Sequence, residues 1–137
     1  MAVTAKWYPS AAHQMFIGNL SSATSSFKIA LLNSSGTYSA SHGVWSDVSS
    51  YQISAGGGYT SGGAAVTITP SSNSTASYFS TSAVLWTLAT FTFQNAVVYD
   101  TVSNRLMLHL NFDTAQSPSS QDYQLNVPSP APSATPA

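Results

Sequence analysis

The residues that could carry acid–base or metal chemistry in this sequence are few and stand far apart. Its three histidines, His13, His42 and His109, show no metal-ligand spacing such as H-x-x-x-H. Cysteine is absent, which excludes disulfides, thiolate nucleophiles and cysteine-ligated metals together. We therefore expect neither a metal site nor a cofactor.

Hydrolytic chemistry has equally little support. Serine is abundant, but no G-x-S-x-G motif is present to expose a nucleophile on a strained turn. Glutamate is absent, so a pair of catalytic carboxylates would need two of only four aspartates. Of these, Asp100 has a simpler interpretation as a turn residue that pairs with Arg105 across a hairpin. We expect the protein not to be an enzyme.

The most specific pattern is the stretch over residues 42–63, HGVWSDVSSYQISAGGGYTSGG. Its glycines could indicate a phosphate-binding loop, but no lysine follows the last glycine and the next segment has the pattern of a strand. Glycines also permit positive φ angles and close backbone approach. We therefore expect an architectural stretch, with a short helix near 46–51 and tight glycine turns that shape an interface.

The chain is nearly devoid of charge. Charged residues make up 5% of its 137 residues, whereas an ordinary soluble domain has about a quarter. A surface with so little charge is favourable when other subunits cover it, which predicts a component of an assembly. A secreted, Ser/Thr-rich adhesive or carbohydrate-binding domain shares this composition and stays an alternative. The charged residues are Lys6, Lys28, Arg105, Asp47, Asp100, Asp113 and Asp122.

Composition also bears on partners and location. With three Lys and Arg residues and a net charge of −1, no basic patch is available to neutralise phosphates, so we expect no binding to nucleic acid. No apolar run is long enough to span a bilayer, and residues 1–10 lack an apolar core of the signal-peptide type. We expect no membrane contact and synthesis in the cytoplasm.

The hydrophobic pattern predicts one all-β domain with extended ends. Residues 1–14 lack a sustained period and are expected to form an extended N-terminal arm, whereas 15–127 are expected to form a β-sandwich. In 128–137, PSPAPSATPA, proline prevents a β-ladder and predicts an extended tail. The strands expected are 15–17, 27–32, 64–69, 83–93, 95–99, 105–113 and 122–127, with a bend or bulge near 89–90.

Segment 105–113 shows the clearest period-two alternation of the sequence, and we expect it to form a hairpin with 95–99. His109 falls on the polar, outward face, where a surface or contact histidine is more common than a metal ligand. The inward face carries Leu106, Leu108, Leu110 and Phe112, and the outward face carries Arg105, Met107, His109, Asn111 and Asp113.

Aromatic residues supply most of the candidates for binding. Their rings could form a platform for stacking sugars, but in a β-sandwich such residues serve more often as core or interface anchors. The candidate interface residues are Trp7, Tyr8, Trp45, Asp47, Tyr51, Tyr59 and His109.

A set of short blocks runs along residues 27–127. The most specific are HGVWSDV at 42–48 and GYTSGG at 58–63, accompanied by FKIAL at 27–31, VVYD at 97–100 and LHLNFD at 108–113. Together these blocks resemble a family of small virion proteins from tailed bacteriophages.

The resemblance implies a small all-β structural component of the phage head or tail. We expect an antiparallel β-sandwich, jelly-roll-like in form, with one short helix and extended arms at both ends. The resemblance further implies a capsid decoration or cement protein on the capsid surface of the virion, with the major capsid protein as its partner and a homotrimer as its own oligomer. A neck or tail component and a carbohydrate-binding module stay as alternatives.

Overall fold

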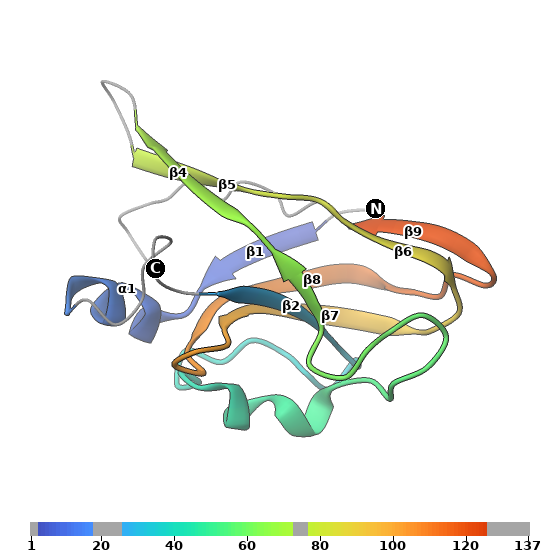
Figure 1. The fold of residues 1–137 in the computed structure, drawn as a ribbon. Coiled ribbons are helices and arrows are strands. Elements are labelled where there is room, and N and C mark those ends of the chain that lie inside the picture. Colours follow the sequence, from blue (N-terminus) through green and yellow to red (C-terminus); the bar gives the residue numbers. More distant parts are fainter. Residues whose placement is uncertain (1–2, 18–25, 73–76, 126–137) are drawn as a thin grey trace.

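The computed structural model describes residues 3–17, 26–72 and 77–125. Its centre is an antiparallel five-stranded sheet with strand order β1-β8-β7-β2-β3. Figure 1 shows this sheet as the middle layer of the molecule. Its strands are β1 (Val3–Trp7), β2 (Phe27–Leu32), β3 (Ala64–Val66), β7 (Phe93–Asp100) and β8 (Leu106–Gln116).

A second antiparallel layer lies against one face of the five-stranded sheet. In this layer β6 (Val84–Ala89) pairs with β9 (Gln121–Leu125), and β4 (Ile68–Ser72) pairs with β5 (Ser77–Thr81) in a hairpin. Figure 1 shows β6 and β9 above the sheet, with the β4–β5 hairpin extending to the upper left. The predicted all-β antiparallel sandwich is confirmed.

A hydrophobic core fills the space between these two layers. Residues from β2, β7 and β8 pack there against Val84 and Trp86 of β6 and Leu125 of β9. The ring of Phe93 meets Phe112 edge to face at 5.0 Å, a favoured aromatic geometry. Burial of these side chains is the main stabilising contribution expected for two sheets packed face to face.

The opposite face of the five-stranded sheet is covered by residues 33–53, which we call the covering segment. The short helix predicted at 46–51 takes the form of two consecutive 3₁₀ turns, η1 (Trp45–Asp47) and η2 (Ser49–Tyr51). Because both faces are covered, β2 and β7 are buried along almost their whole length. The second hydrophobic cluster, under the covering segment, contains Tyr8, Ala30, Leu32, Val48, Val97, Tyr99 and Leu106.

The prediction of an extended N-terminal arm is wrong for the described residues. Strand β1 pairs along its whole length with β8, because the alternation in VTAKW places Val3, Ala5 and Trp7 against the sandwich core. Helix α1 (Pro9–Phe16) follows, and it occupies positions at which a strand was predicted. Its first residue is a proline, whose fixed φ suits the start of a helix. The predicted tail at 128–137 lies outside the described residues.

The predicted hairpin of β7 and β8 is confirmed, but its register shifts at Met107. Val98 pairs with Leu108 whereas the next residue, Tyr99, pairs with Leu106, so Met107 is an extra residue on β8. This bulge turns Leu106 toward the covering segment, while the later apolar residues of β8 face the sandwich core. The prediction that Leu106 shares a face with them is therefore wrong.

Candidate functional site

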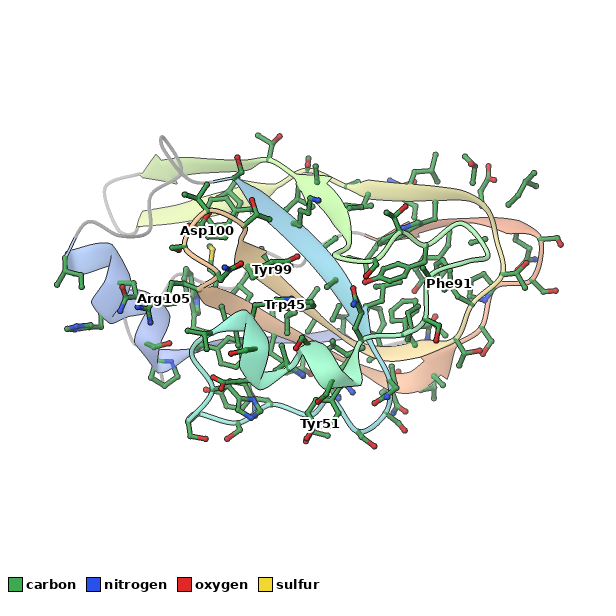
Figure 2. The ribbon with its side chains drawn as sticks, turned by 60° about the horizontal axis from the view of Figure 1, so that its bottom comes forward. Trp45, Tyr51, Phe91, Tyr99, Asp100 and Arg105 are labelled. Carbon is green, nitrogen blue, oxygen red and sulfur yellow. The ribbon has the colours of Figure 1, made fainter. Side chains whose placement is uncertain are left out.

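The covering segment is fixed to the sheet by the aromatic pair Trp45 and Tyr99. Their rings stack with centroids 4.4 Å apart and planes 8° from parallel. Figure 2 labels the two residues next to each other near the middle of this face. The backbone N–H of Trp45 donates to the Asn104 carbonyl at 2.8 Å, and that of Leu106 donates to the Gly43 carbonyl at 3.0 Å. Trp45 is therefore half-buried by contacts within its own chain.

Asp47 and Tyr51 belong to the two turns of the covering segment. The Oδ2 atom of Asp47 accepts hydrogen bonds from the backbone N–H groups of Gly43 at 2.8 Å and Val44 at 3.1 Å. These bonds, the one from Gly43 first, lower the pKa of Asp47 below its ordinary value. Tyr51 is half-buried, and its carbonyl oxygen accepts from the Asn33 N–H at 2.9 Å. Asp47 stays exposed at its turn.

A cluster of four rings lies where the covering segment meets β8. Tyr8 stacks on Tyr38 with centroids 5.3 Å apart, and both rings meet His109 edge to face, at 6.3 and 5.9 Å. The His42 ring lies 6.5 Å from that of Tyr8. Tyr8 is fully buried, and neither its hydroxyl nor His42 Nδ1 has a hydrogen-bond partner. Burial raises the pKa of Tyr8, as do Tyr38 and Asp47, so the hydroxyl stays protonated.

His109 has a structural place in this cluster, and the prediction that it lies on an outward face is wrong. Its side chain is only 1% exposed because the covering segment lies over that face of β8. Nε2 is 2.8 Å from the Gly36 carbonyl oxygen, which can only accept, so Nε2 carries the proton and Nδ1 is unprotonated in the neutral ring. Burial lowers the pKa of His109 against the opposing effect of the Gly36 bond, and Lys6 and His42 lower it further.

Tyr59 is buried at the centre of the glycine-rich stretch. Its hydroxyl donates to Gln52 Oε1 at 2.8 Å and accepts from the Leu31 N–H at 3.2 Å. The same Gln52 oxygen accepts from the Gly62 N–H at 2.7 Å. Burial raises the pKa of Tyr59 to about 12, so its hydroxyl stays protonated near neutral pH. Tyr59 therefore ties the glycine-rich stretch to β2 inside one chain.

The local geometry requires glycine at two positions of this stretch. Gly63 has a φ of +96°, and a Cβ there would lie 2.1 Å from the Ile29 carbonyl oxygen. Gly57 has a φ of +61°, and a Cβ there would lie 1.9 Å from the Thr90 carbonyl oxygen. Neither place admits a side chain. The glycines are architectural, as predicted, and they join parts of one chain.

A polar pocket lies at the margin of the covering segment, beside β1. Its volume is about 300 Å³, and Lys6 Nζ lies 5.1 Å from the centre of the Tyr38 ring, a cation–π distance. The residues described as lining it are Thr4, Lys6, Tyr38, His109 and Asn111. Sequence reasoning missed Lys6 and Tyr38. The alternation in VTAKW was the signal that would have placed Thr4 and Lys6 on one face of a strand.

Two leucines of β6 are exposed on the second layer. Leu85 is 56% exposed and Leu88 is 71% exposed. Leu88 has a φ of +48° within the bulge between Trp86 and Ala89, and its N–H donates to Asp122 Oδ1 at 3.0 Å. The predicted bend is found here, slightly before 89–90. No sequence pattern singled out Leu88.

The seven candidate interface residues thus divide into three groups by exposure. Tyr8 and Tyr59 cannot meet a partner while the chain keeps this fold, because residues of the same chain already cover them, whereas His109 is almost wholly buried but contributes to the lining of the pocket beside β1. Trp7 is half-buried on β1, where it packs against the sandwich core. Tyr8, Tyr59 and His109 are buried, Trp7, Trp45 and Tyr51 are half-buried, and Asp47 is exposed.

Comparison with known proteins identifies no relative: no protein-family model, no curated protein and no solved structure matches the chain. Within residues 3–17, 26–72 and 77–125, no group of three or more His, Asp or Glu side chains is placed to hold a metal ion. Across the same residues, no helix has the length and apolar character needed to cross a membrane. Function must therefore be inferred from the surfaces and the pocket described above.

Proposed function

We propose that this chain is a non-enzymatic virion structural protein, a decoration or cement protein that stabilises the head of a tailed bacteriophage by bridging subunits of the major capsid protein. The observation that carries the proposal is the nearly uncharged surface. Such a surface loses little favourable solvation when a partner covers it. The exposed charged side chains are Lys6, Asp47, Asp113 and Asp122, and backbone N–H groups already bind the carboxylates of Asp47 and Asp122.

The exposed leucines of β6 support the second layer as the surface that meets the shell. Leu88 keeps a left-handed backbone, which costs about 1–2 kcal/mol, although its side chain is mostly outside the core. Strain of this kind clusters at functional positions, such as active sites, ligand clamps and switch regions. Covering Leu85 and Leu88 would contribute roughly 1–2 kcal/mol each, since part of each side chain is already buried.

The layered architecture suits a mechanical role. The five-stranded sheet is packed on one face by β6 and β9 and on the other by the covering segment. Close-packed interiors deform little under load. A body of this kind can hold two neighbours at a fixed separation, as bridging requires.

The alternatives from the sequence differ in how well the structure supports them. A neck or tail component would use the same uncharged surface, so the number of copies of the chain per particle has to distinguish it from a head protein. Carbohydrate binding has less support, because Tyr59 is buried and one face of Trp45 is already covered by Tyr99. Neither Tyr59 nor Trp45 therefore offers the broad exposed platform on which sugars stack.

Quantitative mass spectrometry of purified phage particles tests the location. A decoration protein is present in many copies, at a fixed ratio to the major capsid protein, whereas a neck or tail protein is present in the few copies of a ring. Sedimentation equilibrium of the isolated chain tests the homotrimer. Absence of the chain from the particles would refute the proposal.

Add-back of purified chain to particles that lack it tests the contact surface. Leu85→Thr combined with Leu88→Asn removes the apolar groups and keeps a residue that tolerates the left-handed backbone. We expect this pair to bind roughly tenfold or more weakly, from the burial estimated above. Val102→Thr is the matched control, because Val102 is also 71% exposed but lies in the β7–β8 turn. Equal binding of both variants would exclude the leucine surface.

A further inference from the structure

The pocket beside β1 is built from two neighbouring strands and the covering segment. Thr4 and Lys6 of β1 pair with Asn111 and His109 of β8, which places four polar side chains next to one another on one face of the sheet. Tyr38 of the covering segment completes the lining described for the pocket. The site therefore combines elements distant in sequence, on a rigid sheet that holds their relative positions.

The lining described for this pocket has one charged side chain, Lys6. Its ammonium group lies over the Tyr38 ring, which restrains it without neutralising it, because an aromatic ring carries no net charge. Asp47 is also on the covering segment, but it is not part of the lining, and its Oδ2 is occupied by Gly43 and Val44. The pocket thus favours a negatively charged group.

Hydrogen-bonding side chains share the pocket lining with Lys6. The Thr4 hydroxyl can donate, and Asn111 Nδ2 donates to Asn95 Oδ1 at 2.9 Å, which fixes the orientation of that amide. The His109 ring would gain a second N–H donor on protonation, since Nε2 already donates to Gly36. The Tyr38 hydroxyl donates to the Trp7 carbonyl oxygen at 2.9 Å. The Thr4 hydroxyl is therefore available as a donor in a pocket with a single positive charge, and a protonated His109 ring would supply another.

This geometry points to a binding site for one carboxylate, supplied by an aspartate or glutamate side chain of a partner protein. The carboxylate accepts hydrogen bonds from the Lys6 ammonium and the Thr4 hydroxyl, and it places negative charge next to His109. A volume of about 300 Å³ is at the lower end for ligand pockets and suits a side-chain head group. Assignment of the partner as the shell protein rests on the proposed function, whereas the carboxylate chemistry does not.

Carboxylate binding is coupled to the protonation of His109. The groups that face this ring are Lys6 of β1, Tyr8 before α1, and Tyr38 and His42 of the covering segment. Lys6 and His42 disfavour the charged ring, and a bound carboxylate favours it. Binding therefore raises the pKa of His109, and by reciprocity the carboxylate binds more tightly as the pH falls.

Titration of the full chain with a matched pair of blocked amino acids, followed by the NMR signals of the His109 ring, tests this site. Acetyl-glutamate amide carries the side-chain carboxylate, and acetyl-glutamine amide has the same shape without the charge. We expect saturable shifts with the glutamate compound and none with the glutamine compound. Acetate in a separate arm represents a free carboxylate, which lacks the backbone of a protein side chain.

Lys6→Gln should weaken binding about tenfold or more, because it removes a charge-assisted hydrogen bond. Lys28→Gln, on the same sheet but on β2, is the matched control and should bind as the wild type does. Lys6→Arg, which keeps the charge, should retain binding and shows that position 6 tolerates substitution.

Equal shifts with both blocked compounds, equal losses in the Lys6→Gln and Lys28→Gln variants, or tight binding of acetate alone would each overturn the inference. Because the measurement uses the isolated chain, it stands even where particle analysis refutes the proposed location.

Discussion

The close approach of Gly63 to β2 can be tested by adding one methyl group. In Gly63→Ala the new Cβ would lie 2.1 Å from the Ile29 carbonyl oxygen and 2.9 Å from the Ala30 Cα, both of them backbone atoms. No rotamer change relieves this overlap, so β3 has to move away from β2 by about 1 Å or more to restore an ordinary van der Waals separation. The perturbation therefore acts on the pairing of Ile29 with Ala64 at the edge of the sheet.

The cost can be estimated from two contributions. A non-glycine residue at a φ of +96° costs about 1–2 kcal/mol. Weakening two or three hydrogen bonds of the β2–β3 edge adds about 2–3 kcal/mol. We expect Gly63→Ala to lower the free energy of unfolding by about 3–5 kcal/mol, a large part of the 5–15 kcal/mol typical of a domain.

Gly56→Ala is the matched control for this prediction. Gly56 has a φ of +127°, but a Cβ there would meet nothing within 4 Å, so only the backbone strain of about 1–2 kcal/mol applies. Equilibrium unfolding in urea, followed by tryptophan fluorescence, gives both values under the same conditions. A cost for Gly63→Ala no greater than that for Gly56→Ala would refute the argument from close approach.

Three further predictions concern stability. Leu88→Gly should stabilise the isolated chain by about 0.5–1 kcal/mol, because glycine accepts a φ of +48°. Leu85→Gly in the same strand should destabilise it, and shifts of the urea midpoint in the same direction for both variants would contradict this. Asp100→Asn should cost about 2 kcal/mol, since the carboxylate accepts from Ser26, Val102 and Ser103, and thermal unfolding measures it. Burial alone would raise the pKa of Asp100, but these bonds lower it overall. The stability that the carboxylate contributes is therefore present above the ordinary pKa of 3.8 and is lost as the pH falls through the folded-state pKa. Asp100→Asn should abolish this loss of stability in acid. For His109 the lowered pKa means that the unfolded chain binds the proton more readily, so stability should fall as the pH drops through 6.5, and the slope should be reduced in His109→Gln.

The fold was predictable where local pattern and packing agree. The run FKIALL forms β2 at the predicted positions, and the predicted turn after VVYD joins β7 to β8. The N-terminal segment was not predictable in the same way, because five residues of alternation are too short to distinguish a strand from an arm. Strand β1 forms because it pairs with the edge of β8, a segment about a hundred residues away, and not because of its local sequence alone.

The candidate site was harder to predict because alternation reports the faces of a strand and not what covers them. His109 does alternate with Leu108 and Leu110, as expected, yet the covering segment buries the face on which it lies. That segment has no apolar periodicity, and it is held by stacking of Trp45 on Tyr99 and by hydrogen bonds to β7–β8. Contacts between positions more than fifty residues apart in sequence leave no local signal.

Among the described residues, the Lys6 pocket and the exposed leucines of β6 lie on different layers of the sandwich, and the proposed bridging role requires such a separation. The pocket with Lys6 is on the face under the covering segment, whereas Leu85 and Leu88 belong to the layer that packs on the opposite face. One surface selects a carboxylate and the other apolar contact, so they suit two different patches of a shell rather than one continuous interface. Because the two sites share no residue, the losses from Lys6→Gln and from the leucine pair should add in free energy of binding to particles. If the proposed bridging role is right, a single-site variant should still bind but should no longer raise the temperature at which particles break, since a protein attached at one site does not link two subunits. Full stabilisation of particles by either single-site variant would refute the bridging role. It would not refute the separate proposals that each surface contacts the shell.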